Sequence, residues 1–159
     1  MIYRSKAPLR IGLAGGGTDV SPYSDQFGGA ILNTSISLSA YASIEPLAEN
    51  RIIIHAFDRD EEQVFDLAEQ LPINGTLDLL KGVYNRVQKD HTIPLSGFRL
   101  STFVDAPAGS GLGTSSTLVV AVLGAFLEMH KIKMDEYGIA KYAYDIERND
   151  LKLAGGKQD

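Results

Sequence analysis

The chain has 159 residues, of which 44% are hydrophobic, and its 15 Lys and Arg against 20 Asp and Glu give a net charge of -5. This balance is typical of an ordinary globular domain with one sizeable core. It lacks the basic surplus that a nucleic-acid backbone attracts, so we expect no nucleic-acid partner. The chain also contains no Cys, which excludes disulfides and thiolate metal sites.

The apolar pattern argues against a membrane protein. The most apolar stretch, residues 118–127, is ten residues long, whereas a membrane span needs about 20, so this stretch predicts a buried core helix. The N-terminal charges are not followed by an apolar run of the signal-peptide kind. We therefore expect a cytoplasmic location and no membrane association.

Strand signals fill the first half of the chain and helix signals the second. Short segments rich in β-branched and aromatic residues predict strands over Leu9–Ala14, Ala30–Ser35, Tyr41–Glu45, Ile52–Phe57, Gln63–Leu67 and Phe98–Val104. Apolar residues at helical spacing predict helices over Leu77–Lys89, Ser116–His130 and Asp135–Asn149. No linker or repeat divides these segments, which predicts one α+β unit with helices packed on a sheet.

A glycine-rich loop lies between the strand that ends at Val104 and the next, apolar helix. It reads Asp-Ala-Pro-Ala-Gly-Ser-Gly-Leu-Gly-Thr-Ser-Ser over residues 105–116. The start of a helix carries unpaired N–H groups and the positive end of the helix dipole, and glycines let the backbone approach an anion closely. The loop therefore predicts a phosphate site, although a turn that serves packing alone has the same composition. No Lys follows the last glycine, so this is not the Walker type of phosphate loop.

Three motifs together resemble one family. Residues 107–116 resemble the P-x-x-x-G-L-G-S-S signature of the GHMP kinases, the superfamily of galactokinase, homoserine kinase, mevalonate kinase and phosphomevalonate kinase, with Thr114 in place of the commoner Ser. Residues 7–19 are similar to the N-terminal A-P-G-R-x-x-L-x-G-E-H-x-D block of that family, with Arg10 and Asp19 in matching places. Residues 155–159 resemble the turn that ends in the catalytic aspartate.

The resemblance implies a fold and an activity. The fold would be α+β, of the kind found in domain 2 of ribosomal protein S5, and residues 1–159 would form the N-terminal ATP-binding domain, itself incomplete. The activity would be transfer of the γ-phosphate of ATP to a sugar hydroxyl with the help of Mg²⁺. Because the family is roughly twice as long and carries a further domain, we expect residues 1–159 alone to be inactive.

The same resemblance implies roles for single residues. Asp159 would accept or orient the proton of the attacking hydroxyl, and Arg10 would keep Asp159 ionised and offset the charge of the phosphoryl group. Ser115 and Glu147 would bind Mg²⁺ through oxygen. As isolated charges, Arg10 and Glu147 could equally be solvated surface groups. The nucleotide would be held by Pro107, Gly109, Ser110, Gly111, Leu112, Gly113, Thr114, Ser115 and Ser116.

The N-terminal block also indicates an acceptor. Gly16 and Gly17 stand where galactokinases have a Glu-His pair, which makes galactose a poor candidate, and the sequence A-P-L-R-I-G-x-x-G-G-G-T-D is similar to the heptose-phosphate kinases. We expect Asp19 to bind sugar hydroxyls, with Gly16, Gly17 and Thr18 in the same turn. The implied substrate is D-glycero-D-manno-heptose 7-phosphate, phosphorylated at its anomeric hydroxyl in nucleotide-activated heptose synthesis.

Other functions remain alternatives at this point. Another sugar kinase of the fucose or galactose type fits the motifs, and so does a non-catalytic nucleotide-binding protein on the same fold. A dinucleotide-binding oxidoreductase fits poorly, although Ile11–Gly17 comes after a predicted strand. Val20 occupies the position where the G-x-G-x-x-G pattern from Gly15 needs its last glycine, and no βαβ unit comes next.

Overall fold

Five strands form one mixed sheet within residues 1–158, the part of the chain that the computed structural model describes. They are β1 (Tyr3–Ala14), β2 (Leu32–Pro46), β3 (Arg51–Ala56), β4 (Glu61–Asp66) and β5 (Phe98–Val104), in the spatial order β1-β2-β5-β3-β4. The neighbours pair antiparallel except β3 and β5, which run parallel. A parallel pair needs a crossover connection, and here the chain crosses over through β4 and α2 (Asp78–His91).

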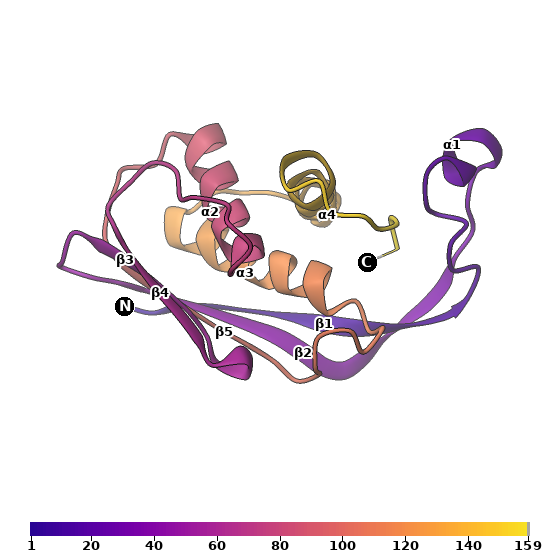
Figure 1. The fold of residues 1–159 in the computed structure, drawn as a ribbon, viewed down its shortest axis with the longest axis horizontal. Helices are drawn as coiled ribbons and strands as arrows, with labels where there is room; N and C mark the ends of the chain where they lie inside the picture. The colour runs from indigo at the N-terminus through magenta and orange to yellow at the C-terminus, as the bar shows by residue number, and fades with distance from the viewer. Residues whose placement is uncertain (159) are drawn as a thin grey trace.

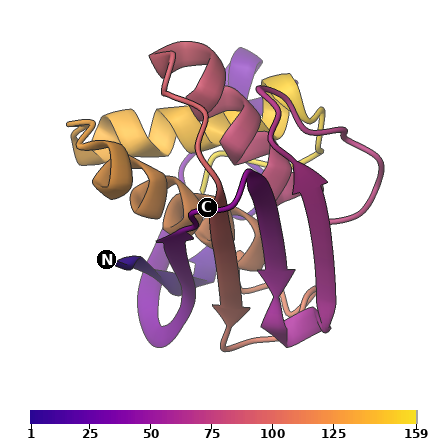
Figure 2. The same cartoon turned by 90° about the vertical axis from the view of Figure 1, so that its left-hand side faces the viewer.

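The main helices lie together over one face of this sheet (Figure 1). Besides α2 they are α3 (Thr114–His130) and α4 (Glu136–Asp145), which continues into a π-helical turn over Ile146–Asp150. Figure 2 shows the same layers from the side of β3, β4 and β5. The fully buried side chains at the interface include Leu9, Ile44, Ile54, Leu80, Leu100, Leu123 and Phe126.

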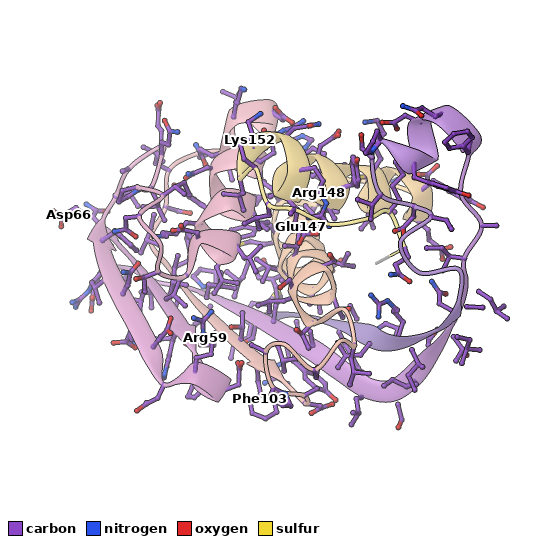
Figure 3. All side chains as sticks on the ribbon, turned by 45° about the vertical axis from the view of Figure 1, so that its right-hand side comes forward. Arg59, Asp66, Phe103, Glu147, Arg148 and Lys152 are labelled. Carbon is purple, nitrogen blue, oxygen red and sulfur yellow. The ribbon has the colours of Figure 1, made fainter. Side chains whose placement is uncertain are left out.

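Sequence patterning explains which side chains enter the core. Along β5, Phe98, Leu100, Thr102 and Val104 are buried, and Phe103 between them is 46% exposed. Because side chains alternate across a strand, one face of β5 meets the helices and the other meets solvent. Figure 3 shows Phe103 on the side of the sheet away from the helices. In α3, residues 119–127 are almost entirely apolar and mostly buried, so the predicted core helix is confirmed.

Several predicted elements differ from the structure in extent. Strand β1 begins at Tyr3, six residues before the predicted start at Leu9. The segments expected over 30–35 and 41–45 belong to the single long strand β2, because β1 pairs with β2 on both sides of a register shift between these segments. A five-residue helix, α1 (Tyr23–Phe27), interrupts the connection from β1 to β2 and buries no side chain. The last helix ends at Asp145 rather than 149, where the chain enters the π-helical turn.

The long β1 and β2 strands extend beyond the helical layer and carry α1 at their far end (Figure 1). The C-terminal residues run from α4 back toward this projecting part of the sheet. Within residues 1–158, no helix combines the length and apolar character that crossing a membrane requires. The α+β architecture predicted from the sequence is confirmed.

Candidate functional site

The glycine loop, residues 107–116, leaves β5 and enters α3 in the way the sequence predicts. Gly109, Gly111 and Gly113 have φ angles of 80°, 75° and 75°, a left-handed conformation that glycine adopts without strain. The N–H of Thr117 donates to the carbonyl of Gly113 at 3.0 Å. The three N–H groups ahead of Thr117 therefore precede the first hydrogen bond of α3 and lie at the positive end of its dipole.

Arg10 fixes the glycine loop from β1. Its Nη1 donates to the carbonyl of Gly111 at 2.8 Å, and its backbone N–H donates to the carbonyl of Leu112 at 3.2 Å. The guanidinium thus lies beside the loop in the position where an anion would need a counter-charge. The family resemblance implies that Arg10 lies near Asp159, but Asp159 lies outside the described residues.

Glu147 meets the start of α3 from the π-helical turn. Its side chain is almost fully buried, and its Oε2 accepts a hydrogen bond of 2.6 Å from the hydroxyl of Ser116. The predicted partner Ser115 lies one residue earlier, is exposed and lines the same pocket. Figure 3 shows Glu147 directly above α3 with Arg148 beside it. The hydrogen bond between Ser116 and Glu147 brings Glu147 close to Ser115, the other predicted metal ligand.

A pocket of about 400 Å³ lies in front of the glycine loop. Its wall combines the loop glycines and hydroxyls with Arg10, Glu147, Arg148 and Gly155. A second pocket of about 400 Å³ adjoins it, since Ser115 and Leu153 line both. The second pocket is mainly apolar, with Ile73, Leu77, Leu80, Leu118, Leu151 and Leu153 in its wall. A charged anion site next to an apolar cavity suits a ligand with a phosphate chain and a flat ring.

The residues at this site fit Mg²⁺ held jointly by protein and phosphate. Over the described range, no three His, Asp or Glu side chains group closely enough to hold a metal ion by themselves. Mg²⁺ in phosphate-transfer sites is bound by one or two carboxylates together with substrate phosphates and water. The Glu147 carboxylate and the Ser115 and Ser116 hydroxyls supply oxygen donors of this kind beside the loop.

The 15–19 turn lies against the C-terminal segment of the chain. Asp19, predicted to face a sugar, is 7% exposed, and its Oδ2 accepts hydrogen bonds from the N–H groups of Lys157 at 2.6 Å and Gln158 at 3.1 Å. Burial raises the pKa of Asp19, but backbone hydrogen bonds from Lys157, Gln158 and Gly17 outweigh it and hold the pKa below its usual value.

The other residues of this turn have separate positions. Thr18 binds back to the chain, because its hydroxyl donates to the carbonyl of Gly15 at 2.8 Å and accepts from the N–H of Ala30 at 3.1 Å. Gly16 and Gly17 are exposed, and a Cβ on either would meet no atom of residues 1–158 within 4 Å. These two glycines leave open surface beside the turn.

Sequence reasoning assigned no role to Arg148, Leu153 or Gly155, all of which line the pocket before the glycine loop. The apolar cavity beside it was also missed, since its leucines come from α2, α3 and the segments before α2 and after the π-helical turn. Arg148 comes directly after Glu147 in the π-helical turn, and both residues line this pocket.

Comparison with known proteins gives consistent matches. The family model for the GHMP kinases N terminal domain matches residues 78–159. The chain is 46% identical over 156 residues to D-glycero-alpha-D-manno-heptose 7-phosphate kinase of Campylobacter jejuni, covering 98% of this chain and 46% of that protein. It is 27% identical to L-fucokinase/L-fucose-1-P guanylyltransferase of Bacteroides fragilis, covering 97% of this chain and 18% of that protein.

A solved structure supports the same likeness. The crystal structure of a D-glycero-D-manno-heptose 1-phosphate kinase from Bacteroides thetaiotaomicron matches 100% of this chain and 52% of its own, with a TM-score of 0.95 and 52% sequence identity. The chain therefore spans about half the length of these heptose-kinase relatives. The fold expected from the sequence motifs is confirmed.

Proposed function

Because the chain belongs to the GHMP kinases, we propose that it is the N-terminal, nucleotide-binding part of an ATP-dependent sugar kinase. The observation that supports this most is the pocket in front of α3. There the glycine loop, a cation on Arg10 and the buried pair of Ser116 and Glu147 surround one space. In phosphoryl transfer a protein mainly positions its reactants and neutralises charge, and this pocket supplies groups for both tasks.

Each group has a proposed task toward ATP. The N–H groups of the glycine loop bind the phosphates, and the adjoining apolar cavity takes the adenine. Glu147 and the Ser115 hydroxyl hold Mg²⁺, while the Ser116 hydroxyl orients the Glu147 carboxylate. Mg²⁺ would offset phosphate charge during transfer. Arg10 adds a further positive charge from the opposite wall.

Asp159 is the proposed group that accepts or orients the proton of the attacking hydroxyl. The heptose-kinase relatives and the open surface at Gly16 and Gly17 support D-glycero-D-manno-heptose 7-phosphate as the acceptor, phosphorylated at its anomeric oxygen. The reaction would supply nucleotide-activated heptose synthesis in the cytoplasm, where ATP is available. The fucokinase relative makes fucose the second candidate.

The test is a substrate panel with the full-length protein. Heptose 7-phosphate, fucose, galactose, mannose and mevalonate are compared by ADP release, and phosphorus NMR locates the new phosphate. We expect heptose 7-phosphate to have the highest kcat/KM, because buried polar groups discriminate strongly against acceptors that leave them unpaired. A higher kcat/KM for fucose or galactose would replace the heptose assignment. ATP binding without turnover on any acceptor would favour the non-catalytic alternative.

A further inference from the structure

We propose that Lys81 is a positioning residue for the nucleotide, because it holds the loop before α2 in the shape that forms one wall of the apolar cavity. We call residues 73–78 the cavity loop. The proposal deepens the proposed function and rests on it, since the cavity is the one assigned to adenine. Lys81 lies in none of the family motifs and lines neither the cavity nor the phosphate pocket.

The burial of Lys81 is the first observation. It lies near the start of α2 and is fully buried, with 0% of the residue exposed. A lysine is almost never fully buried unless its ammonium is paired, because burial takes the charge out of water. Here Nζ donates to Oδ1 of Asn74 at 2.6 Å and lies 2.9 Å from Oδ1 of Asp78. Both partners belong to the cavity loop, so the ammonium points at this loop and not at solvent.

Asp78 extends this contact to the backbone of the cavity loop. Its Oδ1 also accepts from the N–H of Asn74 at 3.0 Å, and its Oδ2 accepts from the N–H of Gly75 at 2.7 Å. Burial raises the pKa of Asp78, but the hydrogen bonds from Lys81 and from these two N–H groups outweigh it and hold the pKa below its usual value. Loss of the Lys81 ammonium would leave this ionised carboxylate without its counter-charge and loosen the backbone that it binds.

The rest of the connection from β4 to α2 is attached to the same helix. Asn85, one turn after Lys81, accepts from the N–H of Leu71 at 2.7 Å and donates to the carbonyl of Leu71 at 2.9 Å. Residues 67–77 form no helix or strand, so side chains of α2 supply partners that regular pairing would otherwise provide. Within this connection, Lys81 holds the part that lies at the cavity.

The cavity loop supplies much of the cavity wall, with Ile73, Gly75, Leu77 and Asp78. Leu77 has a left-handed backbone with a φ of 54°. Such a conformation is strained for a residue with a side chain and persists only where its surroundings hold it. The two partners of Lys81 lie on either side of Leu77 in the chain. Release of the loop should therefore let Leu77 relax and change the shape of the cavity where the base would lie.

This arrangement affects the base and the phosphates differently. Of the two adjoining pockets, the cavity loop lines only the apolar one. A change at Lys81 should therefore weaken the binding of adenine while the phosphates still bind at the glycine loop. Inorganic tripolyphosphate is a probe for this difference, because it has the phosphate chain of ATP and no adenine.

The test compares ATP with tripolyphosphate, each with Mg²⁺, by calorimetry on the full-length protein. Lys81→Met keeps most of the side-chain length and removes the ammonium. We expect its Kd for ATP to rise at least about tenfold and its Kd for tripolyphosphate to change less than about twofold. Lys89→Met is the matched control, because Lys89 is an exposed lysine of the same helix. Both of its Kd values should stay within about twofold of the wild type.

An unchanged Kd for ATP in Lys81→Met, or an equal rise in both Kd values, would overturn the positioning role. Because removal of one partner of a buried ion pair can unfold a domain, Asn74→Ala is the milder second variant. Asn74 is exposed, and its side chain is one of the two partners of Lys81. We expect its Kd for ATP to rise about threefold with tripolyphosphate binding unchanged. A folded Asn74→Ala variant with the ATP affinity of the wild type would also overturn the proposal.

The wild type separates this proposal from the function on which it rests. If the wild type binds ATP no more tightly than tripolyphosphate, the assignment of the cavity to adenine fails, and the role of Lys81 toward adenine fails with it. If the wild type prefers ATP and Lys81→Met keeps the full preference, only the role of Lys81 fails.

Discussion

Two glycine-rich turns in this chain look alike in sequence and are built for different purposes. The 15–19 turn comes directly after β1, and the glycine loop, residues 107–116, is separated from the end of β5 by two residues. The loop enters a helix of 17 residues, whose first N–H groups face a pocket. The turn enters a short irregular connection before a helix of five residues. We therefore propose that the loop, and not the turn, binds the phosphates, because only the loop leads into a long helix.

The space around the glycines also differs between the 15–19 turn and the glycine loop. A Cβ on Gly109 or Gly111 would meet no atom of the described residues within 4 Å, so these glycines leave space for a ligand. A Cβ on Gly15 would lie 1.9 Å from the carbonyl oxygen of Ala30, so this glycine allows two backbone segments to pack. The comparison predicts that changes in the loop alter ligand binding, whereas changes in the turn alter stability or the placement of the 155–158 segment.

The largest expected effect is at the end of that segment. Asp159→Asn should lower kcat by about 100-fold or more and leave the Kd for ATP nearly unchanged, because the proton acceptor is lost and the nucleotide site is kept. Steady-state kinetics and calorimetry on the full-length protein measure the two quantities. Near-normal turnover would show that Asp159 is not the base.

The next effect is in the glycine loop. Gly111→Val fills the space before α3, and we expect the Kd for ATP to rise at least about tenfold, which corresponds to about 1.4 kcal/mol. Gly28→Val is the matched control, because Gly28 also has a positive φ, with open surroundings within residues 1–158, and lies at the end of α1. An equal change in Kd for both variants would attribute the effect to backbone strain and not to the site.

A third effect is on stability alone. Gly15→Ala adds a Cβ against the backbone at a φ of 80°, and the free energy of unfolding should fall by about 2 kcal/mol or more. Gly16→Ala, in open space in the same turn, should change it by less than about 1 kcal/mol. Urea unfolding of both variants measures the difference. Equal stability of Gly15→Ala and Gly16→Ala would contradict the assignment of a packing role to Gly15.

The smallest effect is a pH dependence at Asp19. Its pKa in the folded chain lies below the ordinary value of 3.8, so its stabilising contribution is complete well above that value and is lost as the pH falls through the folded pKa. The difference in free energy of unfolding between the wild type and Asp19→Asn should be constant from about pH 5 to 7 and shrink below about pH 4. A difference that grows in acid would contradict the assigned direction.

Local sequence predicted the elements that hold the site. Apolar spacing predicted α2, the apolar run 118–127 predicted α3, and alternation predicted β5. The composition of residues 107–116 singled out the loop that lines the pocket before α3. Strand β2 was predicted as two pieces, because the three serines within residues 35–39 interrupt the apolar pattern. The pairing of β2 with β1, which makes the strand continuous, is decided across the sheet. Helix α1 was missed because it buries no side chain and so has no apolar face to detect.

Contacts between residues far apart in the sequence could not be predicted from local sequence patterns. Ser116 and Glu147 are 31 positions apart, and Asp19 and Lys157 are 138 apart. The motifs marked Glu147 and Asp19 as functional, but geometry determined their neighbours, and for Asp19 the neighbours are backbone N–H groups. Arg148 carried no motif of its own. Its importance comes from the π-helical turn, which the periodicity of the helix did not reveal.

The most direct test of the difference between the two turns is selective labelling of glycine with nitrogen-15, combined with titration by ATP and Mg²⁺. The amide signals of Gly109, Gly111 and Gly113 should show the largest shifts, because their N–H groups lie in the proposed phosphate site. The signals of Gly15, Gly16 and Gly17 should move little before the sugar is added. Largest shifts at residues 15–17, with residues 109–113 unchanged, would contradict the assignment of the nucleotide site.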